Sequence, residues 1–383
     1  MLTTAVPARK YPDLTAEAIQ EARDLIGTPL RRRPHYTVAT RDVLLRWAKG
    51  GGSRNPLYFD PSHAEFYTHW AGQVGHPSAL MAFDHTFVAP KLAGIHALYA
   101  GVTFEWSKQI RAGDVIRATA TLTAVEEKQG SFCGPMVLQT GLVEYRNQRG
   151  DLVATATPRV MRTPRDAARE RGKYSGLERH RYTPAEFERI IASYQREEFR
   201  GSKPRYVEDL KPGDQLPEVV KGPLTTEDMN FFVGEINETL FFRDFVAHVR
   251  RHPADAYWHE DKGMPDTWDA SFLLDKVARE FGFPVAHDTG LQRVAWLEFL
   301  VTNWMGDLAM LRRLDVRLTH PFFHADTAWL RGTVTGTEIR DRRAFADLAV
   351  RIENQVGVVV AIGAARVEVP SRDFNILQPG LVL

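Results

Sequence analysis

The sequence predicts an α+β protein that contains two copies of one domain, each with helices first and an antiparallel sheet after them. A length of 383 residues is typical of two domains. HADTAWLRGTVTGTEI resembles RAGDVIRATATLTAVEE, and ENQVGVVVAIGAARVEV resembles RNQRGDLVATATPRVM further along. These matches place Asp326 on Asp114 and Asn354 on Asn147. The repeat is far longer than the roughly 20–50 residues of a solenoid array, so it indicates a duplicated domain.

The first half begins with predicted helices. Residues 15–26 carry apolar side chains at helical spacing. Thr40 is a suitable N-cap for a second helix with Asp42 in its first turn, and the following glycine run would end that helix. The stretch SALMAFDHTFV is long and apolar enough for a buried helix. Four β-rich runs come next and are predicted as antiparallel strands: 101–106, 115–127, 136–147 and 152–162.

The same order returns in the second half, where Thr226 and Asp228 take the places of the first-half threonine and aspartate. Between the halves lies a charged stretch with a predicted helix that begins TPAEFERIIASYQ. Thr183 and Glu186 form a capping box there. One apolar stripe predicts that this helix packs against another element; it consists of Phe187, Ile190, Ile191 and Tyr194. We therefore expect an N-terminal domain over residues 1–165, a structured linker over 166–203 and a C-terminal domain over 204–383.

Residues 55–61 (NPLYFDP) are predicted to form a rigid turn ahead of a helix. Two prolines fix φ at both ends of this turn, and Asn55 is biased toward extended geometry because it precedes one of them. Such a turn would hold Asn55, Tyr58 and Asp60 in a defined arrangement, as a binding or catalytic site requires. An ordinary turn before a helix is the alternative.

The run RNPLYFDPSHA resembles the hydratase motif of the MaoC-like, R-specific enoyl-CoA hydratases and dehydratases, usually Asp-x-Asn-Pro-x-His-x-Asp-Pro. Asn55, Asp60 and both prolines match, whereas the family's aspartate falls on Ser53 and its histidine on Tyr58. The resemblance implies two hot-dog units in tandem, a double hot-dog, in which each antiparallel sheet wraps around a central apolar helix. It also implies an acyl-CoA substrate and the addition or removal of water across the 2,3-bond.

Composition excludes several other classes of protein. A formal net charge of +1 gives no reason to expect a nucleic acid or an anionic membrane as partner. A single cysteine excludes an internal disulfide framework and a cysteine-rich metal site. The first residues lack the apolar core of a signal peptide and no apolar run approaches eighteen residues, so we expect a cytoplasmic protein. We expect no metal, no cofactor beyond the CoA of the substrate, and either a monomer or a homodimer.

The first half offers one group of candidate site residues around the motif. Tyr58 is a catalytic candidate that can donate a hydrogen bond, although an ordinary pKa near 10 makes it a poor base at pH 7. Asn55 and Asp60 are expected to contact substrate, together with Gly75 and His76 just before the predicted buried helix.

The second half leaves two alternatives for the corresponding position. In one, His259 is catalytic with Asp255 four residues before it, which imitates the family's aspartate and histidine. In the other, LLDKVAREFGFP corresponds to the motif, so that Asp275 matches Asp60 and Leu273 occupies the place of the histidine. The second alternative preserves the distance to the following glycine-proline element and is slightly preferred.

A further group of candidates precedes the apolar run VAWLEFLVTNW. Asp288, a catalytic candidate, and Thr289 could cap this central helix and leave free N–H groups for a thioester oxygen. His287 and Gly290 are expected to contact substrate, and Arg293 could pair with Asp288 or bind a carboxylate.

The leading functional prediction is an acyl-CoA dehydratase or R-specific enoyl-CoA hydratase, a hydro-lyase of acyl-CoA and fatty acid metabolism. A hot-dog thioesterase is one alternative, with Asp84 or Glu298 as the carboxylate that activates water. An acyl-CoA-binding partner subunit that has lost its acid/base pair is the other.

Overall fold

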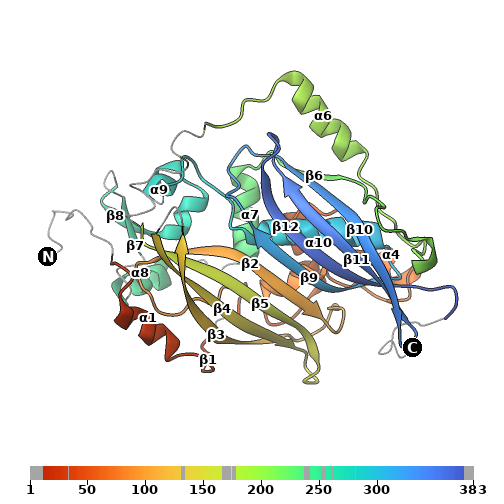
Figure 1. Ribbon diagram of the computed structural model, residues 1–383, viewed down its shortest axis with the longest axis horizontal. Coiled ribbons are helices and arrows are strands. Elements are labelled where there is room, and N and C mark those ends of the chain that lie inside the picture. The colour runs from red at the N-terminus through yellow and green to blue at the C-terminus, as the bar shows by residue number, and fades with distance from the viewer. Residues whose placement is uncertain are drawn as a thin grey trace.

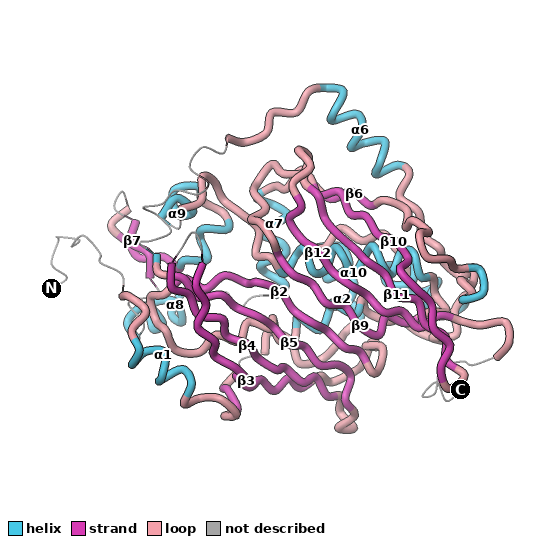
Figure 2. Tube along the Cα trace, in the orientation of Figure 1, coloured by secondary structure: helices cyan, strands magenta, loops and turns pink. Residues whose placement is uncertain are grey.

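The computed structural model forms one ten-stranded antiparallel sheet with helices packed against it (Figures 1 and 2). The residues it describes are 12–32, 34–130, 134–165, 174, 178–236, 242–251, 256–259, 262–280 and 282–374. The strand order is β1-β3-β4-β5-β2-β9-β12-β11-β10-β6. Read outward from its centre, the sheet has the same strand order in each half, which confirms the predicted duplication.

The N-terminal half of the sheet is built from four long strands and one short one. They are β1 (Pro29–Leu30), β2 (His96–Trp106), β3 (Arg117–Gly130), β4 (Gly134–Arg146) and β5 (Leu152–Thr163). Residues that face the core alternate with partly exposed ones along β4 and β5, as expected for strands with one buried face.

The C-terminal half repeats this arrangement. Its strands are β6 (Val219–Lys221), β9 (Met310–Leu318), β10 (Ala328–Arg340), β11 (Arg343–Glu353) and β12 (Val359–Val369). β9 pairs with β12, β12 with β11, β11 with β10, and β10 with the short edge strand β6. The strands predicted from period-two alternation in both halves are thus confirmed.

The two halves join where β2 pairs antiparallel with β9. Gly101 lies opposite Arg317 at this junction and has a φ of +144°. A Cβ atom at this position would lie 2.1 Å from the carbonyl oxygen of Val316. The close approach of the two backbones therefore requires glycine.

Gly101→Ala is expected to lower the free energy of unfolding by roughly 1–3 kcal/mol, because the added methyl group must push β2 and β9 apart. The measurement is the urea midpoint of unfolding. Gly336→Ala is the matched control, since a Cβ atom on that strand glycine of β10 meets nothing within 4 Å. Equal midpoints for the two variants would contradict the expectation.

Short helices precede the N-terminal sheet. They are α1 (Ala16–Arg23), α2 (Arg41–Gly50), α3 (Pro56–Phe59), α4 (Pro61–Phe66) and the 3₁₀ helix η1 (Pro77–Ala82). Thr40 caps α2 through its side chain, as predicted, and α2 ends at the glycine run. The corresponding cap of α7 (Thr226–Ile236) is Thr225, one residue before the predicted one, in a reciprocal pair with Asp228.

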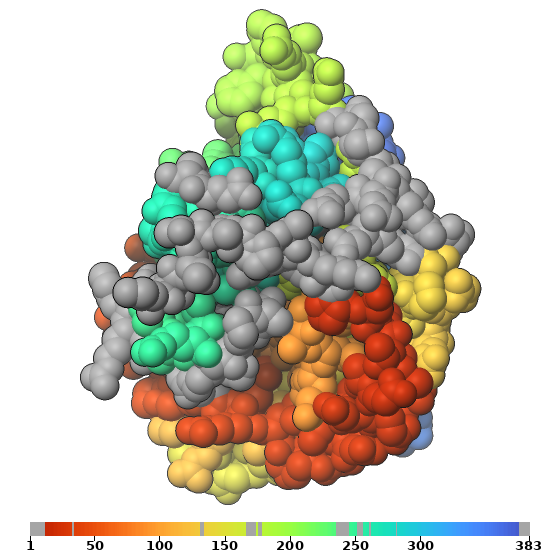
Figure 3. Space-filling view, turned by 90° about the vertical axis from the view of Figure 1, so that its left-hand side faces the viewer, coloured from red at the N-terminus to blue at the C-terminus, as the bar shows by residue number. Residues whose placement is uncertain are grey.

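The C-terminal half carries additional elements between α7 and its central helix. They are α8 (Phe242–Arg251), β7 (Ala256–His259), β8 (Met264–Thr267), η4 (Trp268–Phe272) and α9 (Asp275–Glu280). β7 and β8 form a separate two-stranded sheet. In Figure 3 the chain around α9 (cyan) forms part of the face that is shown.

The central helices of the two halves differ. The C-terminal one, α10 (Leu291–Met305), is buried at every one of its 15 residues, as predicted from its apolar sequence. The expected N-terminal counterpart, SALMAFDHTFV, is buried but forms only the six-residue η1. The prediction of a long helix there was wrong, because an apolar run of this length indicates burial more reliably than it indicates a helix.

The linker between the halves contains the predicted helix α6 (Pro184–Gln195), with its capping box present, and η2 (Val207–Asp209) follows the linker. Only Ile190 of the apolar stripe of α6 is buried, and it packs with Val220 and Trp329. α6 lies at the periphery of the molecule (Figure 1). The bounds predicted for the two domains and the linker stay predictions. Among the described residues, no helix is long and apolar enough to span a membrane.

Candidate active site

A cavity of about 1410 Å³ lies between the N-terminal sheet and the N-terminal end of α10. Most ligand pockets enclose about 300–1,000 Å³, so this cavity can hold a large ligand. Its walls are largely apolar and come from β2, β5, the segment after η1, and the stretch that spans η4. Representative wall residues are Phe87, Leu98, Tyr99, Met136, Met161 and Phe283.

The loop before α10 brings one predicted group of site residues to the cavity wall. His287, Asp288, Thr289, Gly290 and Arg293 all line the cavity. The N-cap of α10 is Gly290, with a φ of 78°, and no described side chain caps it. The expectation that Asp288 and Thr289 cap this helix was therefore wrong. The first N–H groups of a helix lack intrahelical partners and favour a negatively polarised oxygen.

Asp288 and Arg293 form a buried, two-pronged ion pair. The Arg293 Nε donates to Asp288 Oδ2 at 2.7 Å and its Nη2 to Oδ1 at 3.1 Å. The remaining nitrogen, Nη1, donates to the carbonyl oxygens of His320 and Val360. Of the two roles predicted for Arg293, the structure supports pairing with Asp288. The Asp288 Oδ2 also accepts the Gly290 N–H at 3.0 Å, so the carboxylate joins Arg293 to the loop and positions it.

His287 lines the cavity and has one ring nitrogen without a hydrogen-bond partner among the described residues. Its Nδ1 lies 2.7 Å from the carbonyl oxygen of Asp288, so Nδ1 carries the proton and donates it. Nε2 is then an acceptor, and it has no hydrogen-bond partner among the described residues. Burial lowers the pKa of His287 to about 4, so the ring is neutral at pH 7. The Thr289 hydroxyl is also without a partner in the described part of the chain.

The first-half motif lies at the opposite end of α10. Asn55 caps α3, and its amide nitrogen donates to the Thr302 carbonyl oxygen and to Asn303 Oδ1, both at 3.3 Å. Asp60 caps α4 through its side chain. Neither residue lines the cavity. The motif thus ties the N-terminal half to the central helix of the other half, and the predicted substrate contacts of Asn55 and Asp60 find no support.

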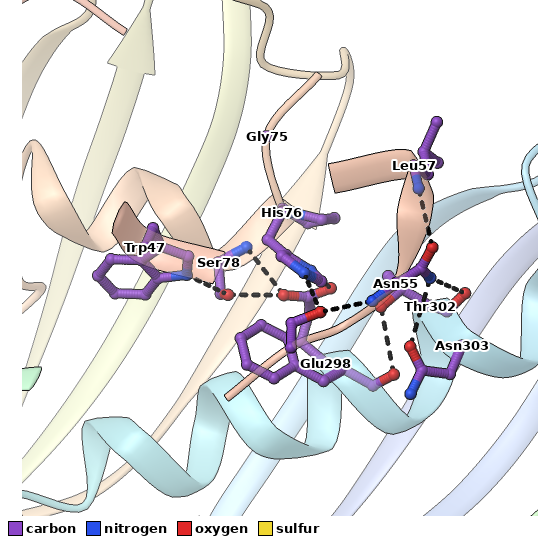
Figure 4. A network of polar contacts seen from close by, with 12 residues as sticks. Trp47, Asn55, Leu57, Gly75, His76, Ser78, Glu298, Thr302 and Asn303 are labelled. Carbon is purple, nitrogen blue, oxygen red and sulfur yellow. Dashed lines mark hydrogen bonds and ion pairs between the residues drawn. The ribbon is translucent and has the colours of Figure 1, made fainter. Parts of the chain in front are cut away.

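A buried polar network centred on His76 and Glu298 lies beside the motif (Figure 4). His76 Nε2 lies 2.8 Å from Ser53 Oγ, and its Nδ1 lies 3.1 Å from Glu298 Oε1. Ser78 Oγ donates to Glu298 Oε2 at 2.6 Å. The Tyr58 ring stacks on His76 at a centroid distance of 3.9 Å. These residues are all at most 3% exposed and none lines the cavity.

Tyr58 is poorly suited to proton transfer in this position. Burial, and then the negative charges of Glu298 and Asp307, raise its pKa well above 10. Gly75 is packed against the core, because a Cβ atom there would lie 2.5 Å from Leu44. The structure therefore places the first group of candidates, including Gly75 and His76, in the interior and away from the cavity.

His259 lies on β7 and is buried, with Asp266 of β8 as its partner at 2.9 Å. Asp255, its predicted partner, lies outside the described residues. Asp275 is the first residue of α9 and Asp60 is the N-cap of α4, so both aspartates lie at the start of a short helix. This agreement favours the alternative in which LLDKVAREFGFP corresponds to the motif, and the β7–β8 hairpin is then an insertion.

The two carboxylates that a thioesterase would need are also away from the cavity wall. Asp84 is buried and accepts two hydrogen bonds from Arg32, at 2.6 and 2.7 Å. Glu298 is fully buried in the network around His76. Neither residue lines the cavity, so neither can activate water there.

Comparisons with known proteins agree with this fold. Residues 24–156 match a family described as FAS1-like, dehydratase domain region. A MaoC-like dehydratase of known structure superposes with a TM-score of 0.62 at 16% identity, over 91% of this chain and 98% of its own. A conserved hypothetical protein from Mycobacterium tuberculosis with a double hot-dog fold gives 0.55 at 11% identity, over 91% of this chain and 97% of its own. The chain has the MaoC-like double hot-dog fold.

A MaoC-like dehydratase from Phytophthora capsici is also similar, with a TM-score of 0.50 at 11% identity over 88% of this chain and 94% of its own. No curated protein matches the sequence. The resemblance to MaoC-like dehydratases and the predicted double hot-dog are thereby confirmed. The sequence departs from the MaoC-like motif at Ser53 and Tyr58, and Ser53 belongs to the network around His76.

Sequence reasoning missed that network and also missed Asp266. Ser53, His76 and Glu298 are far apart in the chain, and no spacing rule joins them. The signal for Asp266 was its place in YWHEDKGMPDTW, where alternating residues around a glycine turn indicate a hairpin and would pair it with His259.

Proposed function

We propose that this protein interconverts 3-hydroxyacyl and 2-enoyl thioesters of CoA in the cavity at the N-terminal end of α10. The proposal rests on one observation, which is that three features lie together in the cavity wall at the start of α10. They are the bare Nε2 of His287, the unpartnered hydroxyl of Thr289, and a helix N-terminus without a described side-chain cap.

The first N–H groups of α10 suit the oxygen of a thioester. Removal of a proton from C2 places negative charge on that oxygen, and backbone N–H groups aimed at developing charge lower the barrier. The macrodipole of a 15-residue helix acts in the same direction. The thioester carbonyl is held here, and the acyl chain extends along the apolar walls formed by Leu98, Met136 and Met161.

His287 then acts on C2. In dehydration its neutral Nε2 accepts the C2 proton, and in hydration it returns that proton to C2. The Nδ1 hydrogen bond to the Asp288 carbonyl keeps the ring in the tautomer that this step needs. Thr289 donates its hydroxyl to the substrate next to the same wall. The reaction needs no cofactor other than the CoA that the substrate carries.

His287→Ala is expected to lower kcat by about 10²–10⁴, the usual contribution of a positioned general base. The measurement is the change in the absorbance of the conjugated enoyl thioester with a panel of 2-enoyl-CoAs of short, long and ring-bearing chains. Thr289→Val, which keeps the shape and removes the hydroxyl, is expected to reduce kcat/KM by a smaller factor of about 5–30, the worth of one hydrogen bond to substrate.

His35→Ala is the control, because His35 is exposed and does not line the cavity. Turnover by wild type that His287→Ala leaves intact would refute the assignment of the site. Binding of every acyl-CoA without turnover would refute the enzyme and favour a binding subunit. Release of free CoA from saturated acyl-CoAs would instead favour a thioesterase.

A further inference from the structure

We infer that Asp266, oriented by His259, is the second proton-transfer group of this cavity and acts on the C3 hydroxyl. The inference rests on the proposed function and adds a catalytic residue to it. Dehydration requires two proton transfers, one at C2 and one at the leaving oxygen, and His287 accounts only for the first.

The hairpin geometry fixes the two side chains against each other. In the β7–β8 register Tyr257 is opposite Asp266, and His259 is opposite Met264. His259 and Asp266 are therefore diagonal neighbours on one face of the hairpin, within reach of each other's side chains. His259 Nε2 lies 2.9 Å from Asp266 Oδ2, and Asp266 Oδ1 accepts the N–H of Thr267 at 2.8 Å.

Asp266 lies between the cavity and His259. Every residue from 266 to 274 lines the cavity, so the end of β8 runs along its wall, whereas His259 does not line it. The His259 side chain is 4% exposed and that of Asp266 is 35% exposed. The histidine is thus behind the carboxylate, and Tyr257 packs edge-on against it at a centroid distance of 4.9 Å. A buried histidine that orients an accessible carboxylate is an arrangement suited to proton transfer.

The family's own proton-transfer positions cannot supply this group. In the first half they are Ser53 and Tyr58, both sealed in the interior. In the second half Leu273 stands in the place of the histidine, according to the correspondence that α9 favours. Among the described residues of the β7–β8 hairpin, Asp266 is the acidic residue that lines the cavity.

Atoms and electrons balance in the direction of dehydration. His287 Nε2 takes the C2 proton, and the electron pair of that C–H bond forms the C2–C3 double bond. The acting form of the Asp266–His259 pair carries one additional proton, as a carboxylic acid beside a neutral imidazole or as a carboxylate beside an imidazolium. The C3–O bond breaks with its electron pair on oxygen, and this oxygen takes the additional proton through the Asp266 carboxyl group. Water departs, and an Asp266 carboxylate and a neutral His259 remain. His287 loses its proton to solvent and the Asp266–His259 pair regains one from solvent.

Asp266→Asn is expected to lower kcat for dehydration by at least 100-fold while KM changes less than threefold. His259→Gln is expected to lower kcat by about tenfold, because the glutamine can still donate a hydrogen bond but is a poorer orienting group. Asp42→Asn is the matched control, since Asp42 is exposed on α2 and outside the cavity wall.

A second measurement separates a catalytic from a structural effect. The 3-hydroxyacyl-CoA is incubated with each variant in D₂O, and exchange of the C2 proton is followed by mass spectrometry. Because exchange needs His287 but no departure of the hydroxyl, Asp266→Asn is expected to retain it while dehydration is lost.

Loss of both exchange and dehydration would mean that Asp266 has only a structural role, and it would overturn the inference. Dehydration by Asp266→Asn within threefold of wild type would overturn the inference and leave the proposed function standing. An inactive wild type would overturn both, and the substrate panel detects that outcome before any variant is made.

Discussion

Replacement of Glu298 by alanine is expected to lower the free energy of unfolding by about 3–5 kcal/mol, the cost of removing one partner from a buried charged network. Glu298 is fully buried on α10. It accepts a hydrogen bond from Ser78 Oγ at 2.6 Å and lies 3.1 Å from His76 Nδ1. Its removal leaves both groups without their acceptor in a place that water does not reach, and each unsatisfied buried group costs about 1–3 kcal/mol.

The measurement is urea unfolding, with the slope m checked for constancy. Glu298→Gln keeps the shape and one acceptor, so a smaller loss of about 1–2 kcal/mol is expected. Glu188→Ala, on the exposed face of α6, is the matched control and is expected to stay within about 0.5 kcal/mol of wild type. A loss below about 1 kcal/mol for Glu298→Ala would mean that the network contributes little to stability.

This network also explains why the motif predicted the fold better than it predicted the site. Asn55 and Asp60 cap the short helices α3 and α4, a role that Asn and Asp favour. A proline follows each of them as the first residue of the helix. These local roles could be predicted from the sequence. The meeting of Ser53 and Tyr58 with His76 and Glu298 depends on tertiary structure, because these partners come together only when η1 packs against α10.

The fold was predictable where local patterns are strong. Period-two alternation indicated the long strands, and capping residues indicated the starts of α2 and α6. The internal repeat indicated the pseudo-symmetric order of the sheet. The pairing of β2 with β9 was not predictable, since it depends on the contact of two remote backbones at Gly101.

Of the candidate site residues, only the group that precedes α10 was correctly placed from the sequence. His287, Asp288, Thr289, Gly290 and Arg293 are close in sequence and precede a strongly apolar helix, so they had to lie at one helix end. The cavity beside them was not predictable. Its lining comes from segments far apart in the chain, from Phe87 to Pro321, and no local pattern shows that such segments enclose a space.

Replacement of Arg293 by methionine is also expected to lower the free energy of unfolding by about 3–5 kcal/mol. Methionine fills much of the same space but leaves the Asp288 carboxylate buried without its cation. It also removes the hydrogen bonds to the carbonyl oxygens of His320 and Val360, which fasten the loop to the sheet. Urea unfolding measures the loss.

The double variant Asp288→Asn/Arg293→Met tests the cause. Neutralising the aspartate removes the uncompensated charge, so the double variant is expected to be more stable than Arg293→Met alone, with a coupling energy of roughly 0.5–3 kcal/mol. Additive effects would contradict the ion pair as the cause. Because the His287 ring is held by the Asp288 carbonyl oxygen, any variant that loosens this loop is also expected to lower kcat for acyl-CoA dehydration. The ion pair between Arg293 and Asp288 therefore couples the stability of the C-terminal half to the position of His287, the proposed base.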